Sequence, residues 1–385
     1  MDFTPTQEQE AARELAARIF ADLSTPERLA GLGGGTDGEL WKELGAAGLV
    51  GAVEETGLLG LALMLEEQGR TTAQVPFAAS CVYGLLAVAA HGTDEQRERL
   101  LPGLREGSAV AAGAFPARGG IVVDALSDGA ERARLTGVVP WVPWLRDATH
   151  VLVAVRGETG SSVHSLWMVR AGDAGCEPVE LTAPWSAGRL VLDGVEAERI
   201  GGPGAYADVL AAARTAFAGL QAGVGAGSLA RAVEYTNERE QFGRPLAAKQ
   251  GVQLRAAEAY MDIEAIRVTT YEAAWRRDVG LPYGSHALTA AWWAAEAGKR
   301  VVHTGQHLHG GMGADLDHPV HRHFLWGRQL DGYLGCGPEL LEELGELIAS
   351  GETGESGESG ETAETGETGA SDEAGEGVDD GGVAA

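Results

Sequence analysis

Hydrophobic positions in the first 110 residues recur every three or four residues, which is the period of an amphipathic helix. Thr4-Pro5-Thr6-Gln7 precedes the first such run, which includes Leu15 and Ile19. This order predicts a helix that begins with Thr4 as its N-cap and Gln7 closing a capping box. Four more helical stretches, separated by glycine-rich turns, are expected at 38–48, 58–69, 74–91 and 94–105. Residues 1–110 are therefore predicted to form a helical domain.

The pattern changes over residues 111–203, where short runs of β-branched and aromatic residues alternate with turn residues about every ten positions. These runs lie at 119–123, 133–139, 151–155, 165–169 and 189–192. Runs of this length and composition are typical of strands. We therefore expect a compact antiparallel β domain in the middle of the chain.

Longer helical patterns occupy residues 204–350. Val209, Phe217 and Val224 mark the apolar face of the first helix, and Pro245 suits the first turn of a second helix ending near Asp278. A third helix is expected at 285–309. Three antiparallel helices and a short fourth would make a four-helix bundle. The predicted fold class is mainly α with a central β domain.

The last segment, residues 351–385, begins with repeats of Gly-Glu-Thr or Gly-Glu-Ser and holds 11 acidic residues but no basic one. Low hydrophobicity and unbalanced charge predict a disordered tail, either solubilising or an interaction arm. The chain has a formal net charge of −27, so the rest carries −27 + 11 = −16. That balance argues against a nucleic-acid-binding surface, which needs a basic stripe.

The three cysteines, Cys81, Cys176 and Cys336, are far apart and form no CxxC pair. Neither a disulfide framework nor a zinc cluster is expected. The N-terminus lacks the basic and apolar regions of a signal peptide, and no apolar run approaches the roughly 20 residues of a membrane span. We expect a cytoplasmic protein.

A first candidate site lies in Glu238-Arg239-Glu240-Gln241-Phe242-Gly243-Arg244-Pro245-Leu246, followed by Gln250. Arg239 is predicted to end one helix and Gln250 to lie about one turn into the next, so both would face one crevice. The planar guanidinium of arginine suits a diphosphate, and Phe242 offers an apolar face to a ring. The alternative is an ordinary corner between two helices with surface charges.

A second candidate site is Gln306-His307-Leu308-His309-Gly310-Gly311-Met312-Gly313. A helix that ends in Gly-Gly-x-Gly lets a ligand approach the bare backbone closely. Six histidines between 303 and 323 suggest a metal site, but no carboxylate accompanies them in a recognised ligand pattern. No metal is expected.

Together these motifs resemble the paired C-terminal signatures of acyl-CoA dehydrogenases. The resemblance rests on Glu-Arg-x-Gln-Phe-Gly-x-Pro-Leu with a glutamine eleven residues after the arginine, and on His-Gly-Gly-x-Gly with a proline eight residues after the second glycine. Segments at 41–49, 66–70, 92–96 and 135–137 also fit the family. The resemblance covers about residues 1–348 and implies the family's order of helical domain, β domain and four-helix domain.

The resemblance implies that FAD lies between the β domain and the bundle and that a neighbouring subunit completes its site. By this resemblance the partner's FAD would be held by Arg239 at the diphosphate, Phe242, Gln250, His307, Gly310 and Gly311. Trp141 falls where the family has a tryptophan beside the isoalloxazine; the alternative is a core residue of the β domain. Pro143 replaces a threonine that hydrogen-bonds the flavin, and proline has no N–H to donate.

The family's reaction needs a carboxylate that removes the α-proton of an acyl-CoA thioester, while the β-hydrogen leaves as hydride to the flavin. The two positions known for that base fall on Leu334 and Ala213, and neither side chain accepts a proton. The nearby carboxylates of Asp331, Glu339 and Asp208 are candidate substitutes, although each is more readily explained as a helix or loop charge. No catalytic residue is therefore assigned.

This pattern resembles the subunit type without the glutamate in actinobacterial heterotetrameric acyl-CoA dehydrogenases for steroid side chains. The leading hypothesis is an oxidoreductase subunit, a flavoprotein of lipid or steroid catabolism, whose homologous partner in a heterotetramer supplies the base. An electron acceptor flavoprotein is then the second partner. Two alternatives stay open: a self-sufficient enzyme with a displaced base, and a non-redox structural or acyl-CoA-binding subunit.

Overall fold

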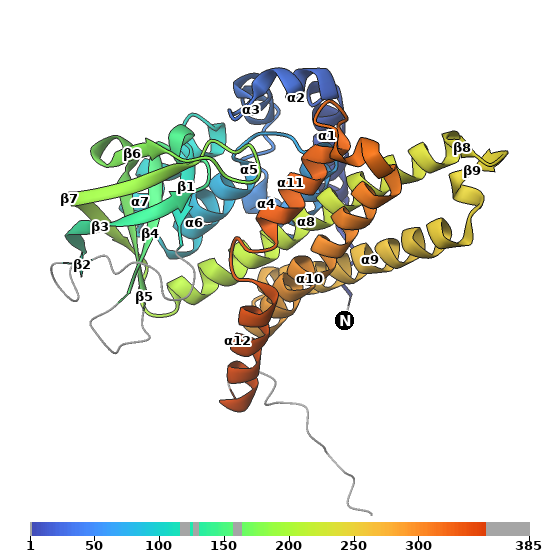
Figure 1. Cartoon of the computed structure of the whole chain (residues 1–385). Helices are drawn as coiled ribbons and strands as arrows, with labels where there is room; N and C mark the ends of the chain where they lie inside the picture. The colour runs from blue at the N-terminus through green and yellow to red at the C-terminus, as the bar shows by residue number, and fades with distance from the viewer. Residues whose placement is uncertain (1, 116–123, 126–130, 157–163, 352–385) are drawn as a thin grey trace, which may run out of the picture.

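The chain folds into an N-terminal group of helices, a curled β sheet and a C-terminal group of long helices (Figure 1). This computed structural model describes residues 2–115, 124–125, 131–156 and 164–351. It confirms the predicted fold class. The element type changes between Glu106 and Ala111 and again between Ile200 and Ala205. We keep the limits 1–110, 111–203 and 204–350, and the tail 351–385, as proposals.

The N-terminal helices pack around a buried apolar core. They are α1 (Gln7–Leu23), α2 (Pro26–Leu32), α3 (Gly38–Ala46), α4 (Val53–Thr71), α5 (Phe77–Ala79), the π-helical η1 (Ser80–Leu86), α6 (Ala87–His91) and α7 (Asp94–Glu106). Within the described residues, no helix is both long and apolar enough to cross a membrane.

The first helix begins later than predicted. Its N-cap is Thr6 rather than Thr4, and the capping box closes through Gln9 rather than Gln7. Each threonine is followed by a glutamine three residues later, so the local sequence is compatible with a capping box at either one. Tertiary contact decides: the amide of Gln9 also donates to the carbonyl oxygen of Thr56 at 2.8 Å.

The central sheet has the order β1-β4-β5-β7-β3-β2, with β6 paired to β7. The strands are β1 (Ala111–Ala114), β2 (Asp124–Ala125), β3 (Arg132–Val142), β4 (His150–Arg156), β5 (His164–Arg170), β6 (Gly175–Pro178) and β7 (Gly188–Ile200). The predicted antiparallel pairing holds except between β1 and β4, which are parallel. The strand expected at 119–123 lies outside the described residues.

The C-terminal group contains three long helices and shorter elements between and after them. Their order is α8 (Ala205–Glu238), β8 (Glu240–Gln241), β9 (Arg244–Pro245), the 3-10 turn η4 (Leu246–Ala248), α9 (Gln250–Asp278), α10 (Gly284–His309), the 3-10 turn η5 (Gly310–Ala314), α11 (Val320–Leu330) and α12 (Gly337–Ala349). Pro245 was predicted to begin a helix; instead it is extended in β9. The reason is a small hairpin, closed where the Leu246 N–H donates to the Arg239 carbonyl oxygen at 2.9 Å.

Glycines bring α4 and α8 into close contact. A Cβ on Gly223 of α8 would lie 2.1 Å from the carbonyl oxygen of Glu66 on α4. A Cβ on Gly69 of α4 would lie 2.3 Å from the carbonyl oxygen of Leu220 on α8. The two backbones therefore pack at a distance that no larger residue allows, and this fixes the bundle against the N-terminal helices.

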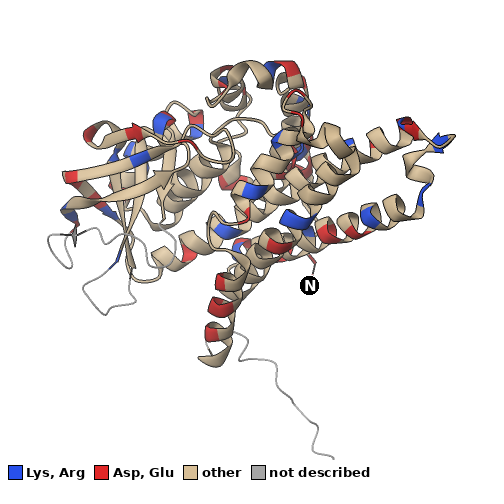
Figure 2. Ribbon diagram, in the orientation of Figure 1, with Lys and Arg blue, Asp and Glu red and all other residues tan. Residues whose placement is uncertain are grey.

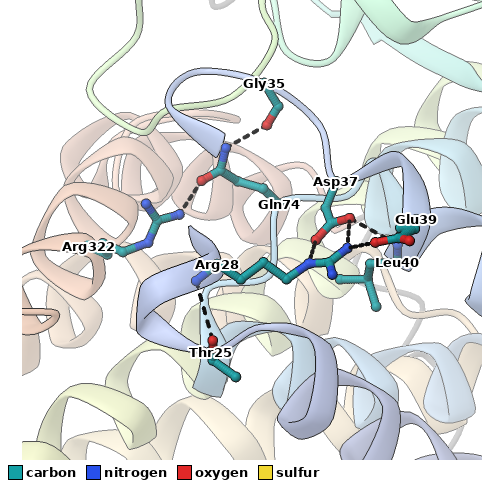
Figure 3. Close-up of polar contacts among 8 residues, drawn as sticks. All are labelled: Thr25, Arg28, Gly35, Asp37, Glu39, Leu40, Gln74 and Arg322. Atoms are coloured by element: carbon teal, nitrogen blue, oxygen red, sulfur yellow. Dashed lines mark hydrogen bonds and ion pairs between the residues drawn. The ribbon is translucent and has the colours of Figure 1, made fainter. Parts of the chain in front are cut away.

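One buried side chain joins all three groups of elements. The amide nitrogen of Gln74 donates to the carbonyl oxygens of Gly35, at 2.5 Å, and of Pro184 before β7, at 3.1 Å. The amide oxygen of Gln74 accepts from the guanidinium of Arg322 on α11, as Figure 3 shows. Burial lowers the pKa of Arg322 to about 10. Each of the three groups thus contributes at least one partner to this amide.

Candidate functional site

Both motifs singled out in the sequence lie at the same end of the bundle. The C-terminal turns of α8 and α10 meet there, because the ring of Tyr235 stacks on that of His309, with centroids 4.8 Å apart and planes 21° apart. Tyr235 precedes Arg239 by one helical turn, and His309 directly precedes Gly310. The stack therefore connects the arginine motif to the glycine motif.

The first motif forms an exposed corner between α8 and α9. Arg239 is the C-cap of α8, and within the described residues it has no ion-pair partner. Gln250 is the first residue of α9 rather than lying a turn inside it. Phe242 stands at the tip with 92% of its surface exposed, and the ammonium of Lys249 lies 5.0 Å from the centre of its ring. Figure 2 shows basic positions at this hairpin.

The backbone of Phe242 has a φ of 58°. Left-handed backbone costs an L-residue about 1–2 kcal/mol, and glycine or asparagine usually occupies such positions. A large apolar ring that is exposed and also strained contributes nothing to the stability of the isolated chain. This combination is typical of a residue held for contact with another molecule.

The second motif offers open backbone beside the end of α10. His307 is exposed on the last turn of the helix, and Gly310 ends it with a φ of 61°. A Cβ built on Gly310 or on Gly311 would meet no atom within 4 Å. An anionic or planar ligand can therefore approach the main chain here. The histidines of 303–323 do not assemble a group of three or more potential metal ligands within the described residues.

The two positions expected for a catalytic base lie elsewhere, where the β domain meets the bundle. Leu334 is in the segment between α11 and α12, and Ala213 is fully buried in α8. The neighbouring Arg214 donates from Nε to the carbonyl oxygen of Leu334 at 3.2 Å. Its two terminal nitrogens donate to the carboxylate of Glu343 on α12 at 2.8 and 2.7 Å. A carboxylate is thus nearby, but it already accepts a bidentate ion pair.

Aromatic side chains fill the space around Leu334. Tyr333 is buried; its hydroxyl lies 3.0 Å from that of Tyr83, and its ring centre lies 4.7 Å from that of Phe217. Burial raises the pKa of both phenols, so both stay neutral. The cavity left beside these rings has a volume of about 20 Å³. That is room for about one water molecule and not for an acyl thioester.

Trp141 belongs to this second region and not to the exposed end of the bundle. It is half-buried on β3, with its ring centre 5.8 Å from that of Tyr333. Pro143, two residues on, is buried. The structure therefore brings Trp141 next to the expected base positions, and it brings Arg239, Phe242, Gln250, His307, Gly310 and Gly311 to the other end of α8.

Asp208 is engaged in a cluster of its own near the start of α8. Its carboxylate oxygens lie 2.7 Å from Nε2 of His91 and 2.5 Å from the hydroxyl of Tyr283, and Arg277 donates at 3.3 Å. Although burial alone would raise the pKa of Asp208, the hydrogen bond with His91 and the charge of Arg277 hold it well below the usual range. So low a pKa makes this carboxylate a poor base.

The other two candidate carboxylates also have partners. Asp331 lies 3.2 Å from Nε of Arg328, and burial raises its pKa despite that charge. Glu339 accepts from the backbone N–H of Cys336 at 3.0 Å and caps α12. These contacts favour a structural role for all three candidate carboxylates, Asp208, Asp331 and Glu339.

Sequence reasoning missed the residues that close the second region. Tyr83, Phe217 and Tyr333 come from three separate segments, and no motif connects them. The position of Tyr333 directly before Leu334 was the one available signal. Sequence reasoning also missed the stack of Tyr235 on His309, although Tyr235 lies four residues before Arg239.

Comparison with known proteins points to one family. The model of the acyl-CoA dehydrogenase N-terminal domain matches residues 6–108, and that of the acyl-CoA dehydrogenase C-terminal domain matches residues 202–338. Acyl-CoA dehydrogenase FadE27 of Mycobacterium tuberculosis (strain ATCC 25618 / H37Rv) is 33% identical over 375 residues, covering 91% of this chain and 99% of that protein.

Two solved structures are similar over nearly the same span. A chain of the Tcur3481-Tcur3483 steroid ACAD G363A variant is 41% identical with a TM-score of 0.84, covering 90% of this chain and 99% of that one. A chain of the ChsE4-ChsE5 complex from Mycobacterium tuberculosis is 31% identical with a TM-score of 0.83, covering 91% and 99%. Both structures contain two named subunits.

Proposed function

The chain belongs to the acyl-CoA dehydrogenase family, and from this premise we propose that it is a subunit of an FAD-dependent enzyme whose homologous partner supplies the catalytic base. The complex would carry out α,β-dehydrogenation of an acyl-CoA thioester. This chain would contribute part of the FAD site and no group that accepts the α-proton. The predicted cytoplasmic location and an electron acceptor flavoprotein as second partner belong to the same proposal.

The filled region around Leu334 is the observation that carries the proposal. Leu334 and Ala213 have no ionisable group, and the cavity of about 20 Å³ beside Leu334 leaves no room for an acyl chain. Tyr333, which lines this cavity, is hydrogen-bonded through its hydroxyl to Tyr83. Proton removal therefore needs a carboxylate from another subunit.

The exposed end of the bundle fits the role of a half-site for the partner's FAD. When bound, FAD supplies the acceptor for the hydride that leaves the β-carbon. Arg239 has no counter-charge of its own within the described residues and suits the diphosphate. Phe242 and Gln250 share its corner, and the open backbone at Gly310 and Gly311 lies beside His307. We propose these six residues as cofactor-binding.

Trp141 fits a flavin less well. Its ring packs against Tyr333, and Pro143 offers no N–H in place of the family's hydrogen bond. We keep Trp141 as a proposed flavin neighbour, but the fit of the isoalloxazine at this chain's own β domain is poor. A complex with one FAD for each pair of unlike subunits is the stoichiometry that follows.

For the substrate we propose a CoA thioester attached to a steroid. Support comes from the 41% identity over 90% of the chain to the solved Tcur3481-Tcur3483 steroid ACAD variant. The pocket for such a substrate would lie in the partner subunit, because this chain's own region is filled.

The test is to purify the chain alone and together with an acyl-CoA dehydrogenase homologue that has the glutamate and is encoded beside it. We expect the complex to retain FAD and to reduce an artificial electron acceptor with a steroid acyl-CoA, and the chain alone to do neither. Arg239→Ala should lower FAD affinity by roughly 10- to 100-fold, because a hydrogen bond to a charged group contributes about 1.5–3 kcal/mol. Arg244→Ala, in the same hairpin, is the matched control.

Dehydrogenation by the chain alone would overturn the proposal in favour of a displaced base. The filled region also favours a second candidate, a structural or acyl-CoA-binding subunit without flavin chemistry. A complex whose flavin bleaches under anaerobic conditions on addition of the acyl-CoA, and loses that flavin with Arg239→Ala, would exclude the second candidate.

A further inference from the structure

The hairpin between α8 and α9 carries an excess of positive charge. Residues 238–255 hold four basic and two acidic side chains, whereas the chain as a whole has a formal net charge of −27. The basic side chains are those of Arg239, Arg244, Lys249 and Arg255. All four are exposed or half-buried, and none forms an ion pair within the part of the chain that the structure describes. The hairpin therefore has positive charge available to an anion.

The C-terminal segment 352–385 has the opposite composition. It holds 11 acidic residues and no basic one. Six of its glutamates recur at every third position from Glu352 to Glu367. The rest of the chain is itself acidic and on balance repels this segment, whereas the hairpin attracts it. Charge complementarity thus favours the hairpin as the place where the segment binds.

The segment is long enough to reach the hairpin. It follows α12, and the ion pair of Glu343 with Arg214 holds α12 beside the first third of α8. Arg239 lies 25 residues after Arg214, so about 38 Å separates their Cα atoms along the helix. The 34 residues from 352 to 385 span up to about 110 Å when extended. Distance therefore does not prevent contact with the hairpin of the same chain.

We propose that segment 352–385 binds the α8–α9 hairpin of its own chain in the free subunit and is displaced by the partner's FAD. The displacement rests on the proposed function, in which Arg239 binds the FAD diphosphate. A glutamate carboxylate and a phosphate both present a pair of oxygens to a guanidinium, so the two cannot occupy Arg239 at once. The segment thus acts as an internal cover of the half-site.

The contact is weak enough to be displaced. Ion pairs between exposed side chains contribute little individually, and salt screens them. The regular spacing of the six glutamates lets the segment bind in several equivalent registers, so no single carboxylate is required. A diphosphate, which carries its charges in one compact group, therefore replaces the segment at Arg239.

The first test detects the contact in the free, full-length chain without FAD. Carbodiimide joins a lysine to a carboxylate in direct contact, and it gives few products here because the chain has three lysines, Lys42, Lys249 and Lys299. We expect an amide between Lys249 and a glutamate of 352–367 within one chain at about 20 mM salt, and its loss at about 1 M salt, where the Debye length is about 3 Å. Lys42, exposed on α3, is the control. No cross-link at Lys249, equal cross-linking of Lys42, or cross-links only between two chains would overturn the proposal.

The second test measures the displacement. A variant with Glu→Gln at positions 352, 355, 358, 361, 364 and 367 keeps the length of the segment but lowers its charge. Titrated with the partner subunit and FAD, it should form the complex about 3- to 10-fold more tightly than the unchanged chain at low salt, and equally tightly at about 1 M salt. Equal affinities at low salt would overturn the proposed displacement. If neither chain forms a complex containing FAD while the Lys249 cross-link is present, the proposed function is at fault and not this contact.

Discussion

At the two positions proposed for a catalytic base, the side chains of Leu334 and Ala213 cannot accept a proton. The neighbouring Arg214 forms a bidentate ion pair with Glu343 of α12. The sequence predicted these two positions only through the family resemblance. It did not predict what fills the space, because Tyr83 and Tyr333 are 250 residues apart and meet only in the folded chain.

His323 makes stability depend on pH. Its ring is 1% exposed, and burial lowers its pKa to about 4, whereas the unfolded chain takes up this proton near pH 6.5. Between these values protonation favours the unfolded chain, so the free energy of unfolding falls as the pH falls. From pH 7 to pH 5 the loss from this residue should be about 2 kcal/mol. His323→Gln, whose amide can still donate to the carbonyl oxygen of Arg70, should remove this pH-dependent loss of unfolding free energy.

Urea unfolding of both proteins at pH 7 and pH 5 checks this expectation. The other histidines whose pKa burial lowers, His150, His303, His309 and His318, are present in both proteins and cancel in the difference. An equal pH dependence in the two proteins would show that His323 does not carry the effect.

Among the elements, the long helices and the strands β3, β4, β5 and β7 followed from periodicity, whereas β1 and the β8–β9 hairpin did not. A helix through Val209 and Val224 that ends at Arg239 was expected, and so was one at 285–309; α8 and α10 agree with both. The strand β1, Ala-Ala-Gly-Ala, has no β-branched residue and is a strand only because β4 pairs with it. The β8–β9 hairpin was missed for a similar reason: Pro245 suits a helix start, and only the hydrogen bond between residues 239 and 246 shows the turn.

The close packing of α4 against α8 depends on glycine, and a substitution in α8 can measure how much stability it contributes. Gly223→Ala should destabilise the chain by about 2 kcal/mol, because the new Cβ would lie 2.1 Å from the carbonyl oxygen of Glu66 and both helices must move. Gly345→Ala in α12 is the matched control, since its Cβ meets nothing within 4 Å. The free energy of unfolding of that variant should rise by roughly 0.5–1 kcal/mol, because alanine has a higher helix propensity than glycine.

Chemical denaturation measures both changes. If Gly223→Ala is as stable as the unchanged chain, the two helices are free to separate without cost. The close contact would then not be what fixes the bundle against the N-terminal helices.

At the scale of the whole molecule, hydrogen bonds of Gln74 connect the three predicted domains. Their order was predictable from the changes in hydrophobic period, but their connection was not. The amide of Gln74 binds residues about 40 positions before it and 110 and 248 positions after it. Contacts of this separation leave no local pattern in a sequence.

Gln74→Leu should therefore destabilise all three groups together. It leaves the guanidinium of Arg322 and the carbonyl groups of Gly35 and Pro184 without their partner, at a cost of about 3 kcal/mol. Far-ultraviolet circular dichroism and tryptophan fluorescence should still report one transition at one urea concentration. Gln253→Leu, at an exposed position, should change the stability by less than about 0.5 kcal/mol. A midpoint for Gln74→Leu equal to that of the unchanged chain would contradict the proposed role of this amide.

The same amide also sets an order of events during synthesis on the ribosome. Gln74 is fully buried, yet its partner Pro184 is made only near the middle of the chain and its partner Arg322 only near the end. Until then the helices of the first 110 residues carry a polar group without its final hydrogen bonds, which costs free energy if it is buried. The nascent N-terminal domain is therefore expected to stay loosely packed, and to depend on protection from aggregation, until α11 has left the exit tunnel.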